Sequence, residues 1–147
     1  MGLAADLQSE VGTIFRSAWT SRVGTKVPEP EEVKLGNDAV ELNATVLYAD
    51  MSASTALVDK NKPSFAAEVY KSFLHCAAKV VRSESGSITA YDGDRIMAVF
   101  IGDAKNTSAV RAALKINWAR IHIVNPLLKK QYPEASYEVK HTIGVDT

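Results

Sequence analysis

The chain has 147 residues, of which 46% are hydrophobic, and its 17 basic and 17 acidic residues cancel. This length and composition predict one globular domain rather than a disordered chain. The charges are scattered, so no basic stripe marks a nucleic-acid partner and no Lys/Arg cluster marks an anionic membrane surface. Cys76 has no partner for an internal disulfide, and no apolar run is long enough to cross a bilayer. We therefore expect a cytoplasmic protein with no membrane segment.

Residues 1–38 predict an N-terminal amphipathic helix and a Pro/Glu-rich linker. Apolar residues recur every three or four positions over residues 3–19, which is the spacing of a helix with one apolar face. Residues 24–32 combine Pro28 and Pro30 with acidic residues, a composition typical of an extended linker. The apolar face of the helix either packs on its own domain or serves as a dimerising or signal-transmitting surface.

Residues 39–147 predict the folded domain, and its first half alternates between strand and helix. A run of β-branched and apolar residues over 40–48 predicts a buried central strand that stops at Asp50. Residues 52–60 predict a turn that opens into a brief helix. A proline suits the first turn of a helix, and apolar residues at helical spacing predict a second helix over 63–83.

The second half predicts a hairpin, a helix and a last strand. Two β-prone arms, 87–91 and 95–101, surround an Asp-Gly pair, which is among the strongest local hairpin signals. A helix follows over about 107–130, bent or broken at Pro126, and a strand over 137–145. The order β-α-β-β-α-β predicts an α+β, ferredoxin-like (split βαβ) palm with a mainly antiparallel sheet and helices on one face.

Two carboxylates, Asp50 and Asp94, occupy unusual places, one at the end of a buried strand and one just past a hairpin turn. If the first strand and the hairpin are neighbours in the sheet, the two side chains lie side by side. Converging carboxylates raise each other's pKa unless a cation intervenes. Magnesium prefers oxygen ligands, and two such ions can clamp an in-line phosphoryl displacement. The pattern favours a metal site; the alternative is two solvated aspartates.

The segment Met51-Ser52-Ala53-Ser54-Thr55 joins that strand to a helix start and is made mostly of small residues. Backbone N–H groups at such a position can face an anion, and small side chains let a triphosphate come close. Helix capping by Ser and Thr, with no ligand, is the alternative explanation.

These segments resemble the motifs of class III adenylate and guanylate cyclases. Residues 44–51 with Thr55 resemble the strand and turn of that family, which end in an Asp, an aliphatic residue and then a Thr. Residues 86–100 resemble its glycine-led hairpin with Gly-Asp at the tip. Residues 109–114 are similar to its Ala-rich helix, and 143–145 to the Gly-Ile motif of a later strand. The resemblance extends from about residue 43 to residue 147.

The resemblance implies a lyase of signal transduction that converts a purine nucleoside triphosphate, ATP more than GTP, to the 3′,5′-cyclic monophosphate and pyrophosphate. It implies that Asp50 and Asp94 hold two Mg²⁺ or Mn²⁺ ions and that the Met51 carbonyl adds a metal ligand. It further implies that the backbone of residues 52–55 and Gly93 contacts the phosphates. Active sites of this family form between two protomers, so the resemblance also implies a homodimer for the intact domain.

Two departures from the family bear on function. Ala90 stands where adenylate cyclases usually carry a base-reading Lys, and a methyl group cannot hydrogen-bond a purine, so the base stays open. The chain stops at Thr147, before the segment in which the family supplies an Asn and an Arg. We therefore expect a front portion of the domain that is weak or inactive alone. The alternative is a degenerate nucleotide-binding or regulatory module; the hairpin tip, residues 92–94, lacks the Gly-Gly-acidic pattern of diguanylate synthesis.

Overall fold

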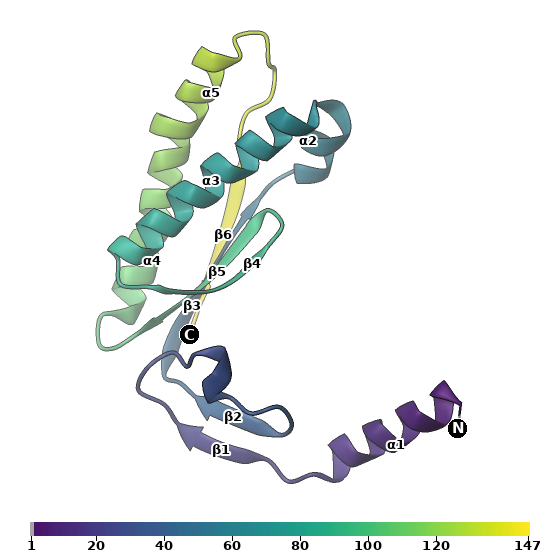
Figure 1. Cartoon of the computed structure of the whole chain (residues 1–147). Coiled ribbons are helices and arrows are strands. Elements are labelled where there is room, and N and C mark those ends of the chain that lie inside the picture. The colour runs from purple at the N-terminus through teal and green to yellow at the C-terminus, as the bar shows by residue number, and fades with distance from the viewer. Residues whose placement is uncertain (1) are drawn as a thin grey trace. The chain divides into compact units, whose positions relative to one another are not determined.

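A computed structural model describes residues 2–147 (Figure 1). The chain divides into two compact units, Met1–Leu42 and Asn43–Thr147. None of the helices within the described residues is both long enough and apolar enough to span a membrane.

The first unit holds a helix and a small parallel sheet. Its elements are α1 (Leu3–Arg16), β1 (Thr20–Val23), the 3₁₀ helix η1 (Pro30–Glu32) and β2 (Asp38–Glu41). β1 and β2 pair in parallel over their full lengths. The side-chain amide of Asn37 donates to the carbonyls of Ile14 and Ser17 at 3.0 and 2.6 Å, which anchors the end of α1. The predicted helix is confirmed, and the predicted linker, residues 24–32, holds the 3₁₀ helix η1 and is flanked by the paired strands β1 and β2.

The apolar face of α1 has no partner within its own unit. No described residue of α1 is buried, and Leu7, Ile14 and Phe15 are 49%, 58% and 84% exposed. The amphipathic pattern is therefore present without a core beneath it.

The second unit has the predicted ferredoxin-like topology. Its elements are β3 (Ala44–Met51), α2 (Ser54–Lys60), α3 (Pro63–Ser83), β4 (Ser87–Asp92), β5 (Arg95–Ile101), α4 (Lys105–Ala119), the π-helical η2 (Arg120–Val124), α5 (Asn125–Gln131) and β6 (His141–Asp146). The sheet order is β4-β5-β3-β6, and all neighbouring strands are antiparallel. The α+β palm is confirmed.

One face of this sheet is covered and the other is open. α3 packs on β4 and β5, and α4 packs on β3, β5 and β6 (Figure 1). In β3, Leu47, Ala49 and Met51 are buried in this core, whereas Tyr48 is exposed and Asp50 half-buried. Because successive side chains on a strand point to opposite faces, Tyr48 and Asp50 belong to the open face.

Two predicted strand boundaries are wrong, whereas the helix predicted over about 107–130 is confirmed as a helical stretch over 105–131 with an irregular segment before Pro126. The strand predicted over 40–48 is two strands, since β2 ends at residue 41 in the first unit and β3 begins at 44. The helix loosens into η2 one turn before Pro126, because proline cannot donate to the carbonyl four residues earlier. The last strand begins at 141 instead of 137, because the Asn125 side chain takes both the N–H (2.8 Å) and the carbonyl (3.0 Å) of Val139.

Candidate active site

The carboxyl end of β3 and the tip of the β4–β5 hairpin lie side by side. Asp50 is the register partner of Arg95 on β5. The next residue, Met51, donates its backbone N–H to the carbonyl of Asp94 at 3.3 Å. The adjacency on which the sequence interpretation depended is therefore observed: the backbones that carry Asp50 and Asp94 are hydrogen-bonded neighbours.

The hairpin reverses through Gly93 and Asp94, not through the predicted Asp92-Gly93 pair. Asp92 still belongs to β4 and pairs with Arg95. Gly93 has φ 59°, whereas Asp94 is not among the residues with positive φ, which is the pattern of a type II′ turn. Asp94 thus lies in the turn itself, and the alternation of the strands does not fix the face to which its side chain belongs.

Asp50 presents its carboxylate on the open face, where it lies near the guanidinium of Arg95. The Nε of Arg95 is 3.8 Å from Oδ1 of Asp50, and the two side chains are 47% and 44% exposed. The sequence interpretation did not identify Arg95. The signal that could have found it is register, since the first residue after the turn faces the end of the neighbouring strand.

Asp94 lies near a half-buried tyrosine, Tyr137. Burial raises the pKa of Tyr137, and the charges of Tyr70 and Asp94 raise it further. The Tyr137 hydroxyl is enclosed and finds no hydrogen-bond partner within the described residues. Asp94 is therefore partly exposed to solvent at the hairpin tip and lies near the Tyr137 hydroxyl, which has no hydrogen-bond partner within the described residues.

The segment predicted to hold phosphates has an unusual backbone. Ala53 has φ 57° and ψ 34°, a left-handed conformation that is uncommon for a residue with a β-carbon. The N–H of Ser52 donates to the Lys140 carbonyl at 2.9 Å, so this predicted phosphate donor is already engaged. The carbonyl of Ser54 accepts from the Tyr70 hydroxyl at 3.3 Å. Thr55 is exposed in the first turn of α2.

A cavity of about 440 Å³ opens beside this segment. Ser52 and Ala53 line it together with Lys60 and Lys140, the end of α2 and the residue before β6. Lys60 and Lys140 outnumber Glu138 among the charged residues that line the cavity, which gives it a small excess of positive charge that suits an anion.

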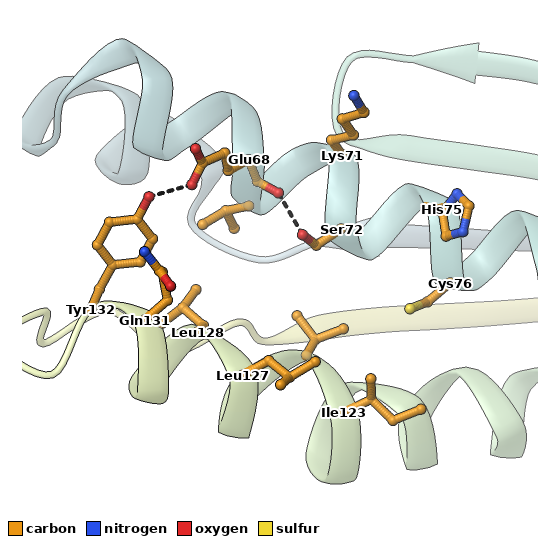
Figure 2. A pocket seen from close by; sticks show the side chains of 12 residues that line it. Glu68, Lys71, Ser72, His75, Cys76, Ile123, Leu127, Leu128, Gln131 and Tyr132 are labelled. Carbon is orange, nitrogen blue, oxygen red and sulfur yellow. Dashed lines mark hydrogen bonds between the residues drawn. The ribbon is translucent and has the colours of Figure 1, made fainter.

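A second cavity, also about 440 Å³, lies away from these residues (Figure 2). It separates α3 from the helical segment of η2 and α5, and Figure 2 shows Cys76 facing Ile123 and Leu127 across it. None of the predicted site residues lines it. Burial raises the pKa of the Cys76 thiol, which makes it a poorer nucleophile. The exposed surface of this cavity is mainly apolar, although polar side chains such as Glu68, Lys71 and His75 also line it (Figure 2).

Asp50 and Asp94 lie on hydrogen-bonded backbones at the end of β3, which makes them a candidate pair of metal ligands and not a cage. No group of three or more His, Cys, Asp or Glu side chains capable of holding a metal occurs in residues 2–147. Asp50 and Asp94 supply carboxylates, and Met51, whose side chain is 3% exposed, can offer its backbone carbonyl. Magnesium sites that also use substrate phosphates commonly take one or two carboxylates.

Solved structures share this fold. The guanylyl cyclase Cya2 superposes with a TM-score of 0.63 at 20% identity, over 69% of this chain and 52% of that one. The adenylyl cyclase CyaB from P. aeruginosa superposes with a TM-score of 0.58 at 18% identity, over 69% of this chain and 54% of that one. No family model matches the sequence. The chain shares the palm fold of class III nucleotide cyclase domains, and its motifs resemble theirs.

Curated relatives are more similar in sequence. A uridylate cyclase of Burkholderia cepacia is 48% identical over 149 aligned residues, and one of Xanthomonas perforans is 45% identical over 148. Both alignments include all of this chain, which spans 65% and 64% of the length of these relatives.

Proposed function

We propose that residues 39–147 form part of a nucleotide cyclase domain whose substrate is UTP and whose products are cyclic UMP and pyrophosphate. The observation that carries the proposal is the juxtaposition of Asp50 and Asp94 through the hydrogen bond between Met51 and Asp94. The relatives named uridylate cyclase, similar over the whole chain, support uridine in place of the purine predicted from the resemblance.

Asp50, Asp94 and the Met51 carbonyl are the proposed ligands of two Mg²⁺ or Mn²⁺ ions. When bound, such ions would lower the pKa of the ribose 3′-hydroxyl and stabilise negative charge on the phosphates. The N–H of Ser52 already donates to the Lys140 carbonyl, so it is not a proposed phosphate contact. The proposed contacts are the backbone N–H groups of residues 53–55 and of Gly93. The chain's own contribution is to fix these groups at one end of a rigid sheet.

The base has a proposed place on the open face, one row away from Asp50. Ala90, Met97, Tyr48 and Gly144 stand opposite one another across the four strands. Ala90 and Gly144 leave space on either side, and Tyr48 is 45% exposed. Its ring offers a stacking surface and its hydroxyl a hydrogen bond. This row has one aromatic residue, Tyr48, and it has Ala90 in place of the lysine that usually reads a purine. Such a row suits a base smaller than a purine.

The protein is proposed to act as a homodimer, as the family resemblance implies. One similar solved structure is described as a non-canonical dimeric guanylyl cyclase domain (TM-score 0.57, 11% identity, 70% of this chain) and another as a monomeric one (TM-score 0.52, 11% identity, 69% of this chain). The assay therefore uses the longest available form of the protein at several concentrations, so that an active dimer is detected by its concentration dependence.

The decisive experiment offers UTP, CTP, ATP and GTP separately with Mn²⁺ and identifies cyclic products by mass spectrometry. Cyclic UMP is the expected product. Cyclic AMP or cyclic GMP as the main product would restore the purine prediction. Metal-dependent binding of UTP without any product would indicate the regulatory module instead.

Asp50→Asn and Asp94→Asn test the metal ligands in the same assay. Each is expected to lower kcat/KM by on the order of a hundredfold or more, because several kcal/mol of charge stabilisation depend on the ions. Asp59→Asn, at an exposed aspartate on α2, is the matched control and should retain activity. Equal activity in all three variants would contradict the assignment.

A further inference from the structure

Arg95 stands between acidic side chains at the candidate metal site. Register places Asp92, Arg95, Asp50 and Thr142 opposite one another on β4, β5, β3 and β6. Directly opposed residues on antiparallel strands have their side chains on the same face, with β-carbons about 4.5–5.5 Å apart. The neighbour of Arg95 in the chain is Asp94. One guanidinium therefore has an opposed carboxylate on either side and a third next to it in sequence.

The contact between Arg95 and Asp50 contributes little to the stability of the fold. Its shortest approach is 3.8 Å, longer than a hydrogen bond, and both side chains are about half exposed. Exposed ion pairs of this kind contribute little to folding. The pair also conflicts with the proposed metal, because a guanidinium and a divalent cation repel each other when they share one carboxylate.

We infer that Arg95 is the counter-ion of Asp50 in the unloaded domain and moves to a phosphate oxygen of the nucleotide when the metal–nucleotide complex binds. The inference rests on the proposed function. The half-exposed side chain is free to change partners. A guanidinium suits phosphate because its planar donors can form two parallel hydrogen bonds.

This exchange makes metal binding depend on the nucleotide. Free metal must displace Arg95 from Asp50 without compensation, so it binds weakly. Metal that arrives with a triphosphate provides the displaced guanidinium with a new anionic partner. The two binding equilibria should therefore respond to the loss of Arg95 in opposite directions, which a purely structural residue would not produce.

Isothermal titration calorimetry of Mn²⁺ alone, and of Mn²⁺ with a nonhydrolysable UTP analogue, tests the exchange. Arg95→Gln is expected to bind free Mn²⁺ about fivefold more tightly, or about 1 kcal/mol, the attraction of two unit charges about 4 Å apart in water. The same variant should bind the metal–nucleotide complex about fivefold more weakly. Arg95→Lys, which keeps the charge, should stay within about twofold of the original protein for free Mn²⁺.

Two controls separate this inference from the proposed function. Arg82→Gln, at an exposed arginine in the last turn of α3, should change neither constant. If Arg95→Gln leaves both constants unchanged or weakens both, the counter-ion role is wrong while the metal site stands. If Asp50→Asn and Asp94→Asn bind Mn²⁺ as well as the original protein does, the metal site itself is wrong. A melting temperature within about 2 °C of the original shows that each variant is folded.

Discussion

Ala53 carries backbone strain at the point where the candidate phosphate segment enters α2. Its φ of 57° and ψ of 34° are left-handed, and this conformation costs a residue with a β-carbon about 1–2 kcal/mol. The side chain is exposed, so its removal loses little packing. Ala53→Gly relieves the strain but adds about 0.4–1 kcal/mol of freedom to the unfolded chain. The net expectation is a stabilisation of about 0.5–1 kcal/mol.

Thermal unfolding measures this gain directly. For a unit of about 100 residues, a gain of 0.5–1 kcal/mol raises Tm by roughly 2–5 °C. Ser85→Gly is a matched control, since Ser85 has φ 64° in the turn after α3 and should also gain. Ala67→Gly, at an exposed position inside α3, should lose about 1 kcal/mol because no strain offsets the entropy. The strain assignment fails if Ala53→Gly lowers Tm as Ala67→Gly does.

Two further predictions concern the core and its response to pH. Leu47 is fully buried in the central strand, so Leu47→Ala should lower the free energy of unfolding by about 2–5 kcal/mol in urea titrations, whereas Leu7→Ser on α1 should change it by less than about 0.5 kcal/mol. Burial, and secondarily the charge of Arg120, lowers the pKa of His141 below its usual 6.5. The unfolded chain then binds a proton more readily than the folded one, so stability is complete above about pH 6.5 and falls as the pH drops below it. His141→Gln should make the urea midpoint depend less on pH between pH 6.5 and 5. If the midpoint of this variant falls with pH as steeply as that of the original protein, His141 is not the cause of the pH dependence.

Local signals predicted the elements of the second unit, and long-range contacts decided where they differ from prediction. Pro63 begins α3 as predicted, because a proline needs no N–H in the first turn. The β1–β2 pair was missed because two short strands separated by a proline-rich stretch carry no local signature of parallel pairing. The late start of β6 was missed because it depends on Asn125, a residue of α5. The side chain of Asn125 forms hydrogen bonds with the backbone N–H and carbonyl of Val139, which are then not free to pair in the sheet.

In the candidate site, too, some residues could be predicted from local sequence signals and others only from long-range contacts. Asp50 and Asp94 could be paired from the sequence because a split βαβ order makes the first strand a neighbour of the hairpin. Arg95 and Tyr48 could not, because their importance depends on which residue stands opposite which, and a register shift of one residue would send each to the other face. Motifs thus predicted which segments meet, and only the register identified the groups on the open face.

The register also gives the proposed substrate a direction. The row of Tyr48 and the row of Asp50 are two residues apart on β3, which is about 7 Å at 3.4 Å per residue. A ribose must bridge that interval if the base lies over the first row and the phosphates lie beyond the second. The nucleotide would then run along β3 toward the hairpin tip, with its phosphates reaching Arg95 before the loop at residues 53–55. Tyr48→Ala should therefore weaken discrimination between bases, while Arg95→Gln should alter metal–triphosphate binding equally for every base. Effects of both substitutions on the same property would mean that the two rows do not contact separate parts of one nucleotide.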